Sequence, residues 1–163
     1  MNLIAVVDQN WAIGKGGEQF VYLSGDLKNF KALTLGHPVL LGRKTLATFP
    51  GGRPLGGREN IVLSRQEGLV VPGAKVVHSM EEALAVCGED TFVIGGGSVY
   101  AAALPWCDTA YITKLAGAWE ADTWFPDLDA DGGWRLAETS APMEEKGVGY
   151  TFCRYERVGG VET

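Results

Sequence analysis

The chain has 163 residues, of which 46% are hydrophobic and 21% are charged, and its formal net charge is −6. This length predicts a single domain, residues 1–163, with a substantial buried core, and the composition excludes a disordered chain. The acidic balance argues against nucleic acid as the main partner, because neutralising phosphates requires a dense basic surface. It leaves room for a small anionic ligand held by a local basic cluster.

The first two thirds of the chain alternate short apolar runs, rich in β-branched residues, with segments of helical periodicity. Such alternation predicts an α/β fold, a mostly parallel sheet with helices on both faces. Ser79, followed three residues later by Glu82, predicts a capping box at the start of one helix. The expected strands are residues 3–8, 38–42, 60–64, 74–78, 91–95 and 109–115, and the expected helices are residues 26–35, 43–49, 79–88 and 98–107.

The pattern changes after Leu115. Residues 134–141 and 148–158 alternate apolar and polar side chains, as half-buried strands do, and residues 142–147 between them have the composition of a turn. We therefore expect an antiparallel hairpin at one edge of the sheet.

Three cysteines, Cys87, Cys107 and Cys153, form an odd set without metal-ligand spacing, which favours a reducing, cytoplasmic location. The apolar run within residues 1–10 is too short for the core of a signal peptide or for a membrane span. It predicts a buried first strand.

Asp26 is the first candidate site residue. On a helix it lies over Phe30 and Leu33, at the border of the apolar stripe. An acid in the first turn can simply complement the helix dipole. A carboxylate that borders a buried face must instead find a partner or take up a proton, since burying an unpaired charge is costly.

Strand-to-helix junctions come next, because ligands of open α/β sheets bind beyond the carboxyl ends of the strands. Gly95, Gly96 and Gly97 follow a buried strand and precede a helix. They form either a merely tight turn or a place where the backbone closely approaches an anion such as a pyrophosphate.

Gly42, Arg43, Lys44 and Thr45 make the second junction. Two cations at a helix N-terminus oppose the helix dipole unless an anion binds there, and an ordinary solvated surface charge is the alternative. The residue types therefore indicate a second candidate contact for a phosphate.

Two further segments carry arginines. Ser64 and Arg65 end a third strand, where an arginine suits a 2′-phosphate and favours NADPH over NADH. The loop 49–60 contains Arg53 and Arg58, either of which could hold a carboxylate in a bidentate pair or could be an ordinary surface charge.

These segments, in this order and spacing, resemble the dihydrofolate reductase family over nearly the whole chain. The resemblance implies a single-domain fold with a central, mostly parallel eight-stranded sheet, an antiparallel C-terminal edge hairpin and flanking helices. It also implies NADPH-dependent reduction of 7,8-dihydrofolate to 5,6,7,8-tetrahydrofolate, a reaction of one-carbon metabolism. The segments that carry it are residues 3–7, 13–17, 26–31, 38–45, 51–65, 93–100, 111–115 and 122–127.

The resemblance implies a substrate site. Asp26 would accept hydrogen bonds from the amino group and N3 of the pterin, and Thr113 would support its carboxylate. An ionised acid there favours the protonated pterin that accepts hydride. Arg58 would clamp the α-carboxylate of the glutamate tail, and Tyr100 would sit near the nicotinamide. The other implied substrate residues are Ile4 and Ile94, through their backbone carbonyls, and Leu27, Phe30 and Phe49, along the aminobenzoyl group.

The same resemblance implies NADPH as the cofactor. Arg43, Ser64 and Arg65 would face its 2′-phosphate, and the family has a cis peptide bond at the position of Gly95 and Gly96. The remaining implied cofactor residues are Val6, Ile13, Gly14, Gly42, Lys44, Thr45, Leu63, Gly97, Ser98, Val99, Tyr100 and Thr123.

Residues 12–20, rich in glycine, would form a mobile loop that closes over the nicotinamide. Water is the expected source of the proton for N5, since no second acid falls in these motifs.

Val21 stands where the family usually has a tryptophan, and valine cannot donate the hydrogen bond of an indole. The expected partners are dihydrofolate and antifolate inhibitors, bound by a monomer that needs no metal, nucleic acid or membrane.

Two other functions fit parts of the sequence. A reductase of the same fold that acts on another heterocycle, such as a pyrimidine of riboflavin biosynthesis, shares the glycine turn but not the pairing of Asp26 with Arg58. An NADPH-binding module without activity is the second alternative. Consumption of NADPH in the presence of dihydrofolate distinguishes these from the main hypothesis.

Overall fold

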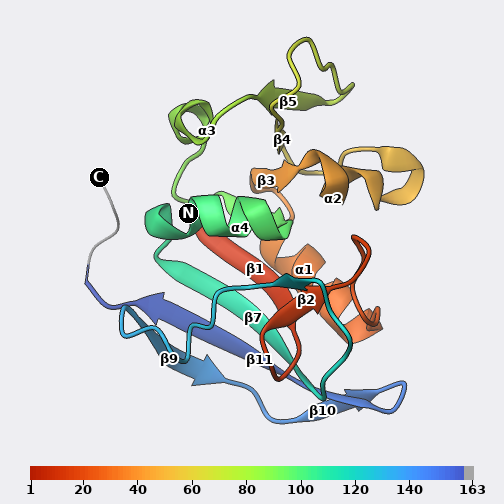
Figure 1. Ribbon diagram of the computed structural model, residues 1–163, viewed down its shortest axis with the longest axis vertical. Coiled ribbons are helices and arrows are strands. Elements are labelled where there is room, and N and C mark those ends of the chain that lie inside the picture. The colour runs from red at the N-terminus through yellow and green to blue at the C-terminus, as the bar shows by residue number, and fades with distance from the viewer. Residues whose placement is uncertain (160–163) are drawn as a thin grey trace.

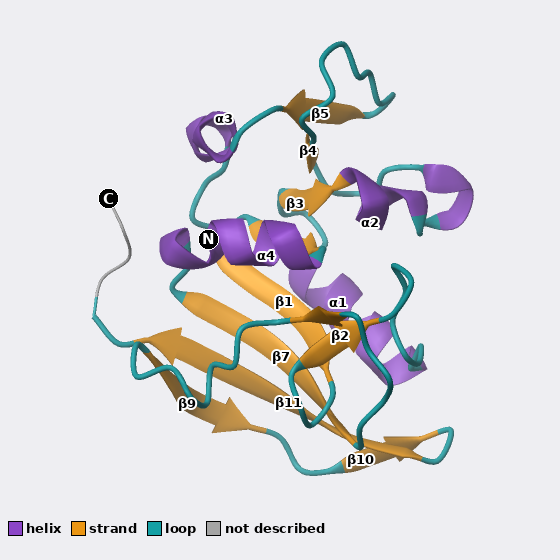
Figure 2. Ribbon diagram, in the orientation of Figure 1, coloured by secondary structure: helices purple, strands orange, loops and turns teal. Residues whose placement is uncertain are grey.

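The computed structural model describes residues 1–159 (Figures 1 and 2). Its large sheet consists of β1 (Asn2–Val7), β3 (Val39–Gly42), β4 (Asn60–Leu63), β5 (Ala74–Val77), β6 (Phe92–Gly95), β7 (Thr109–Ala116), β9 (Trp134–Thr139), β10 (Met143–Glu145) and β11 (Val148–Arg157). The strand order is β10-β11-β7-β1-β6-β3-β4-β5, and β9 pairs with another part of β11, so β9 and β10 share one edge position. The sheet therefore has eight positions across, and the expected α/β architecture is confirmed.

Within residues 1–159, four α-helices cover the sheet, and side chains of β1 show how the two faces differ. Leu3 and Val7 belong to a buried cluster that includes Tyr100, whereas Ile4 belongs to a second cluster against which Phe30 packs. Successive side chains of a strand point to opposite faces, so each face must be covered. The helices are α1 (Ser24–Thr34), α2 (Arg43–Ala47), α3 (Met80–Val86) and α4 (Gly97–Ala103).

The C-terminal edge is antiparallel, as expected, but residues 142–147 are not only a turn. They contain β10, which pairs with the start of β11 through Glu145 and Val148. The turn is limited to Lys146 and Gly147, whose φ angles are 53° and 75°. Two positive φ angles are typical of a two-residue type I′ hairpin turn. The turn is thus shorter than the composition indicated.

A second, two-stranded sheet was not expected from the sequence. It pairs β2 (Ala12–Gly14) with β8 (Thr123–Trp124), and strands of this length are too short to show a period of two. Nearby, the backbone N–H of Gly16 donates to Oδ2 of Asp122 at 2.9 Å. The glycine-rich segment 12–20 is therefore joined to the chain that follows β7.

The start of α3 differs in one detail from the predicted capping box. Oγ of Ser79 accepts a hydrogen bond from the Glu82 backbone N–H at 3.1 Å, as expected. The Glu82 carboxylate, however, accepts from the backbone N–H of His78 at 2.6 Å. Glu82 therefore reaches one residue further back than in a standard capping box and still satisfies a backbone donor. Within residues 1–159, none of the helices is both long and apolar enough to span a membrane.

Candidate functional site

Asp26 lies in the first turn of α1 and its side chain is 9% exposed. Its Oδ1 accepts a hydrogen bond from Oγ1 of Thr113, on β7, at 2.6 Å. In the described part of the chain, no protein donor contacts Oδ2. The structure therefore brings Asp26 and Thr113 together and leaves one carboxylate oxygen for a ligand.

The environment of Asp26 makes its charged form costly. Burial raises the pKa of the Asp26 carboxyl above its ordinary value, and the hydrogen bond from Thr113 offsets part of that rise. A ligand that donates hydrogen bonds to this carboxylate would relieve the remaining cost, because such bonds stabilise the ionised form.

We expect Asp26→Asn to stabilise the ligand-free protein at pH 7. An acid whose pKa is higher in the folded chain favours folding at low pH, and this contribution is lost as pH rises from the ordinary value of 3.8 through the folded pKa. Above its folded pKa the native carboxyl is a poorly solvated charge, and the amide avoids that cost. Thermal unfolding from about pH 4 to about pH 8 should show a gain in Tm that disappears at the acid end. The exposed Glu144 supplies the control, Glu144→Gln, and a lower Tm for the Asp26 variant at pH 7 would contradict the interpretation.

Tyr100 lies on α4 and packs on the face of the sheet opposite to the one that α1 covers. Its hydroxyl donates to the backbone carbonyl of Ile4 at 2.6 Å, and its side chain is buried. Burial raises the pKa of the Tyr100 hydroxyl well above its usual range, and the negative charge of Asp26 adds to this effect. The hydroxyl is therefore a donor at neutral pH. The Ile4 carbonyl keeps a second lone pair for another donor.

The expected apolar residues of the substrate site lie in one hydrophobic cluster. Ile4 and Ile94 are buried within it, and Phe30 and Phe49 pack against it from α1 and from the segment after α2. Leu27 differs, since 51% of its side chain is exposed. An exposed leucine one residue after the buried acid provides apolar surface for a ligand to cover.

Arg58 is fixed beside α1. Its Nε donates to the carbonyl of Gly56 at 2.9 Å, and one terminal nitrogen donates to Oγ1 of Thr34 at 3.2 Å. Thr34 is fully buried and lies on the same helix as Asp26. Burial lowers the pKa of the Arg58 guanidinium, which still remains charged at neutral pH. The sequence did not predict that Thr34 would hold Arg58. The one indication was a hydroxyl side chain on the apolar stripe of the helix.

The strand-to-helix junction at Gly42 lies beside the one at Gly95 and Gly96. A Cβ atom at residue 42 would lie 3.9 Å from the Gly95 carbonyl oxygen and from the Gly96 nitrogen. Oγ1 of Thr45 is 3.2 Å from the Cβ position of Gly95. The peptide bond between Gly95 and Gly96 is cis, as the resemblance implied.

The start of α4 is equally crowded. A Cβ atom at residue 97 would lie 2.6 Å from Cγ2 of Thr123 and 3.8 Å from Cδ1 of Ile13. Of the other expected cofactor residues, Gly14 and Val99 are buried, Val6 and Leu63 are half-buried, and Ser98 is exposed.

A polar group gathers where α2 begins and β4 ends. Arg43 donates to the side chain of Gln66, and the Gln66 backbone N–H donates to Oγ of Ser64 at 3.2 Å. Nδ1 of His78 lies 2.8 Å from the Ser64 carbonyl oxygen. Gln66 and His78 were not expected, because Gln66 contacts Arg43 and His78 contacts Ser64, and each pair joins residues far apart in the chain. The expected Lys44 and Arg65 are exposed beside this group.

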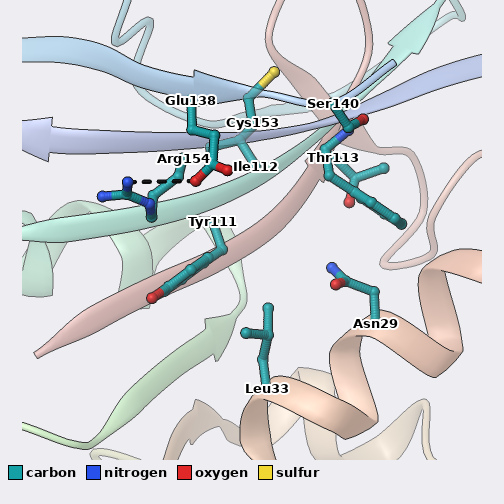
Figure 3. Close-up of a pocket in the computed structure, with 10 residues that line it drawn as sticks. Asn29, Leu33, Tyr111, Ile112, Thr113, Glu138, Ser140, Cys153 and Arg154 are labelled. Atoms are coloured by element: carbon teal, nitrogen blue, oxygen red, sulfur yellow. Dashed lines mark hydrogen bonds and ion pairs between the residues drawn. The ribbon is translucent and has the colours of Figure 1, made fainter. Parts of the chain in front are cut away.

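A cavity of about 320 Å³ lies between α1, β7 and β11 (Figure 3). Asn29 and Leu33 reach toward it from α1, and Tyr111 and Arg154 border it from β7 and β11. Of the expected substrate residues, only Thr113 lines it. Sequence reasoning did not predict this cavity, because it forms between elements far apart in the chain.

These features are typical of a small α/β enzyme, with glycine junctions at the carboxyl ends of its strands and a buried acid beside an apolar surface. The family model for dihydrofolate reductase matches residues 1–157. The dihydrofolate reductase of Neisseria gonorrhoeae is 40% identical over 158 residues, which cover 95% of this chain and 96% of the relative. That of Bacillus subtilis (strain 168) is 35% identical over 161 residues, 96% of this chain and 94% of the relative.

A solved structure adds the three-dimensional likeness. Dihydrofolate reductase from Enterococcus faecalis, complexed with NADP(H) and RAB-propyl, superposes with a TM-score of 0.83 and 33% identity. The match covers 96% of this chain and 95% of that chain. The chain belongs to the dihydrofolate reductase family.

Proposed function

We propose that the chain reduces 7,8-dihydrofolate to 5,6,7,8-tetrahydrofolate with NADPH, and that Asp26 is the residue that makes the pterin reactive. One observation carries this proposal: a buried carboxylate is held by Thr113 at 2.6 Å while its other oxygen has no protein donor in the described chain. Membership of the dihydrofolate reductase family supports the same reaction. These matches do not favour either alternative function.

The residues present fit the cofactor. Gly95, Gly96 and Gly97 carry no side chains, so the backbone at the start of α4 can approach a pyrophosphate closely. Arg43, Ser64 and Arg65 supply donors suited to a 2′-phosphate. When bound, NADPH supplies a hydride to the carbon of the imine bond in the pterin ring.

The chain's own groups complete the reaction by position and charge. Asp26 would accept hydrogen bonds from the pterin and stabilise the cation that forms when N5 takes a proton from water. Thr113 orients this carboxylate, and the Tyr100 hydroxyl holds the Ile4 carbonyl of β1, which would lie next to the bound ring. Arg58, held by Thr34, would bind the carboxylate of the glutamate tail. These residues would hold the two reactants next to each other, so the reaction requires no covalent intermediate with the protein.

We also propose that the enzyme works as a cytoplasmic monomer. Asp26, Arg58 and both glycine junctions come from one chain, so the site needs no second copy. Cys87, Cys107 and Cys153 are free thiols, which suits a reducing compartment. Antifolates that carry an amino group on a flat ring would compete for Asp26.

A direct test mixes the purified protein with NADPH and dihydrofolate and follows the nicotinamide absorbance. We expect one NADPH to be consumed for each dihydrofolate, and NADH to be used more slowly because it lacks the 2′-phosphate. Binding of NADPH without consumption would favour the inactive module. Consumption with a riboflavin-pathway pyrimidine, but not with dihydrofolate, would favour the other reductase.

A further inference from the structure

The first turn of α1 is held by a carboxylate from the other end of the chain. Glu145, the last residue of β10, accepts hydrogen bonds from the Ser24 backbone N–H at 2.6 Å and from the Ser24 hydroxyl at 2.8 Å. It also accepts one from the Gly25 backbone N–H at 3.2 Å. Asp26 is the next residue along the helix.

This contact replaces an ordinary helix cap. The N-cap residue of α1, Leu23, has no polar side chain, and no side-chain cap bond is made there. Free N–H groups at a helix start need an acceptor, and an anion is favoured because of the helix dipole. Glu145 supplies both. These hydrogen bonds lower the pKa of the Glu145 carboxyl, which therefore stays ionised at neutral pH.

Two neighbouring contacts make the junction tight. Nζ of Lys146 donates to the backbone carbonyl of Tyr22 at 2.7 Å, so the hairpin holds the chain just before the helix as well. A Cβ atom at residue 25 would lie only 2.3 Å from the hydroxyl of Tyr150, so Gly25 allows β11 to approach α1 closely. The hairpin and the helix start thus form one packed unit.

We propose that Glu145 is a positioning residue for the reaction: it caps α1 from the C-terminal hairpin and thereby sets the place of Asp26 against Thr113 and the pterin. The inference rests on the proposed role of Asp26. It adds a residue 119 positions away in the sequence that touches neither substrate nor cofactor but determines where the acid stands.

The first test compares Glu145→Ala and Glu145→Gln with Glu144→Ala. Glu144 is the neighbouring residue, is exposed and carries the same charge, so it controls for net charge and for the hairpin. Stopped-flow mixing of the preformed enzyme–NADPH complex with saturating dihydrofolate gives the hydride-transfer rate. We expect Glu145→Ala to slow it about three- to tenfold, because small misplacements of a reacting group are costly. Glu145→Gln retains an acceptor and should recover part of the rate.

A purely structural role predicts a different pattern. Loss of Tm without a change in hydride transfer, or a slower rate for Glu144→Ala as well, would overturn the proposal. The Kd for NADPH should stay within about twofold of the unmodified protein, since the cofactor junctions lie on other elements. If the unmodified protein shows no hydride transfer at all, the proposed function itself fails.

A double-mutant cycle locates the effect on α1. Ser24 is the first helical residue, where proline is well accepted, so Ser24→Pro removes the N–H and the hydroxyl with little damage to the helix. In that background Glu145→Ala should slow hydride transfer less than about twofold. An equal slowing in both backgrounds would show that Glu145 does not act through its two hydrogen bonds with Ser24, and would refute the proposal.

Discussion

Asp26→Asn should lower the hydride-transfer rate at pH 7 by about a hundredfold or more, the range typical of losing a group that manages a proton in the transition state. The amide keeps the shape of the side chain and can still accept from Thr113. It has no negative charge to stabilise the protonated pterin. The loss therefore falls on the transition state more than on binding. Single-turnover measurements with saturating NADPH and dihydrofolate check it.

Two controls make that result specific. The Kd for NADPH should change little, because the glycine junctions and the Arg43 group lie apart from Asp26. The variant should also regain rate as pH falls, since solvent protons then replace the missing stabilisation of the protonated ring. A rate that is unchanged at pH 7, or an equal loss of NADPH affinity, would contradict the role assigned to Asp26. The same variant is expected to be the more stable one without ligand, so lost activity could not be ascribed to unfolding.

The parts of the fold that sequence predicted well depend on local patterns. The strand β1 is a short apolar run, and α3 follows a recognisable N-cap at Ser79, so both could be placed without knowing the rest of the molecule. The border position of Asp26 followed from helical spacing alone. Its partner did not: Thr113 lies 87 residues away and was assigned only through the family resemblance.

What the sequence could not predict involves contacts between distant segments. The pairing of Arg58 with Thr34 and the capping of Ser24 by Glu145 join residues separated by 24 and 121 positions. Each of these side chains looks like an ordinary surface or stripe residue in its own segment. Only the arrangement of the sheet brings them together. The short strand β10 was missed for a related reason, since its pairing with β11 outweighs a composition typical of turns.

Gly95→Ala should weaken NADPH binding by about tenfold or more, which corresponds to about 1.4 kcal/mol. The φ angle of Gly95 is 138°, a conformation that residues with side chains rarely adopt, and such strain costs about 1–3 kcal/mol. The new methyl group would also lie 3.2 Å from Oγ1 of Thr45 and 3.6 Å from the hydroxyl of Tyr100. That hydroxyl is held by the Ile4 carbonyl and cannot move aside freely. The junction before α4 must shift instead.

The same strain acts on folding, so binding and stability have to be measured on one sample. A shifted junction misaligns the N–H groups at the start of α4, and titration with NADPH, followed by tryptophan fluorescence, should report this as a higher Kd. Gly132→Ala is the matched control, because residue 132 has open space around its Cβ position and no positive φ. If Gly95→Ala lowered Tm but left the Kd for NADPH equal to that of the control, this turn would be a folding element only. The binding of the pyrophosphate would then have to be assigned to the junction at Gly42.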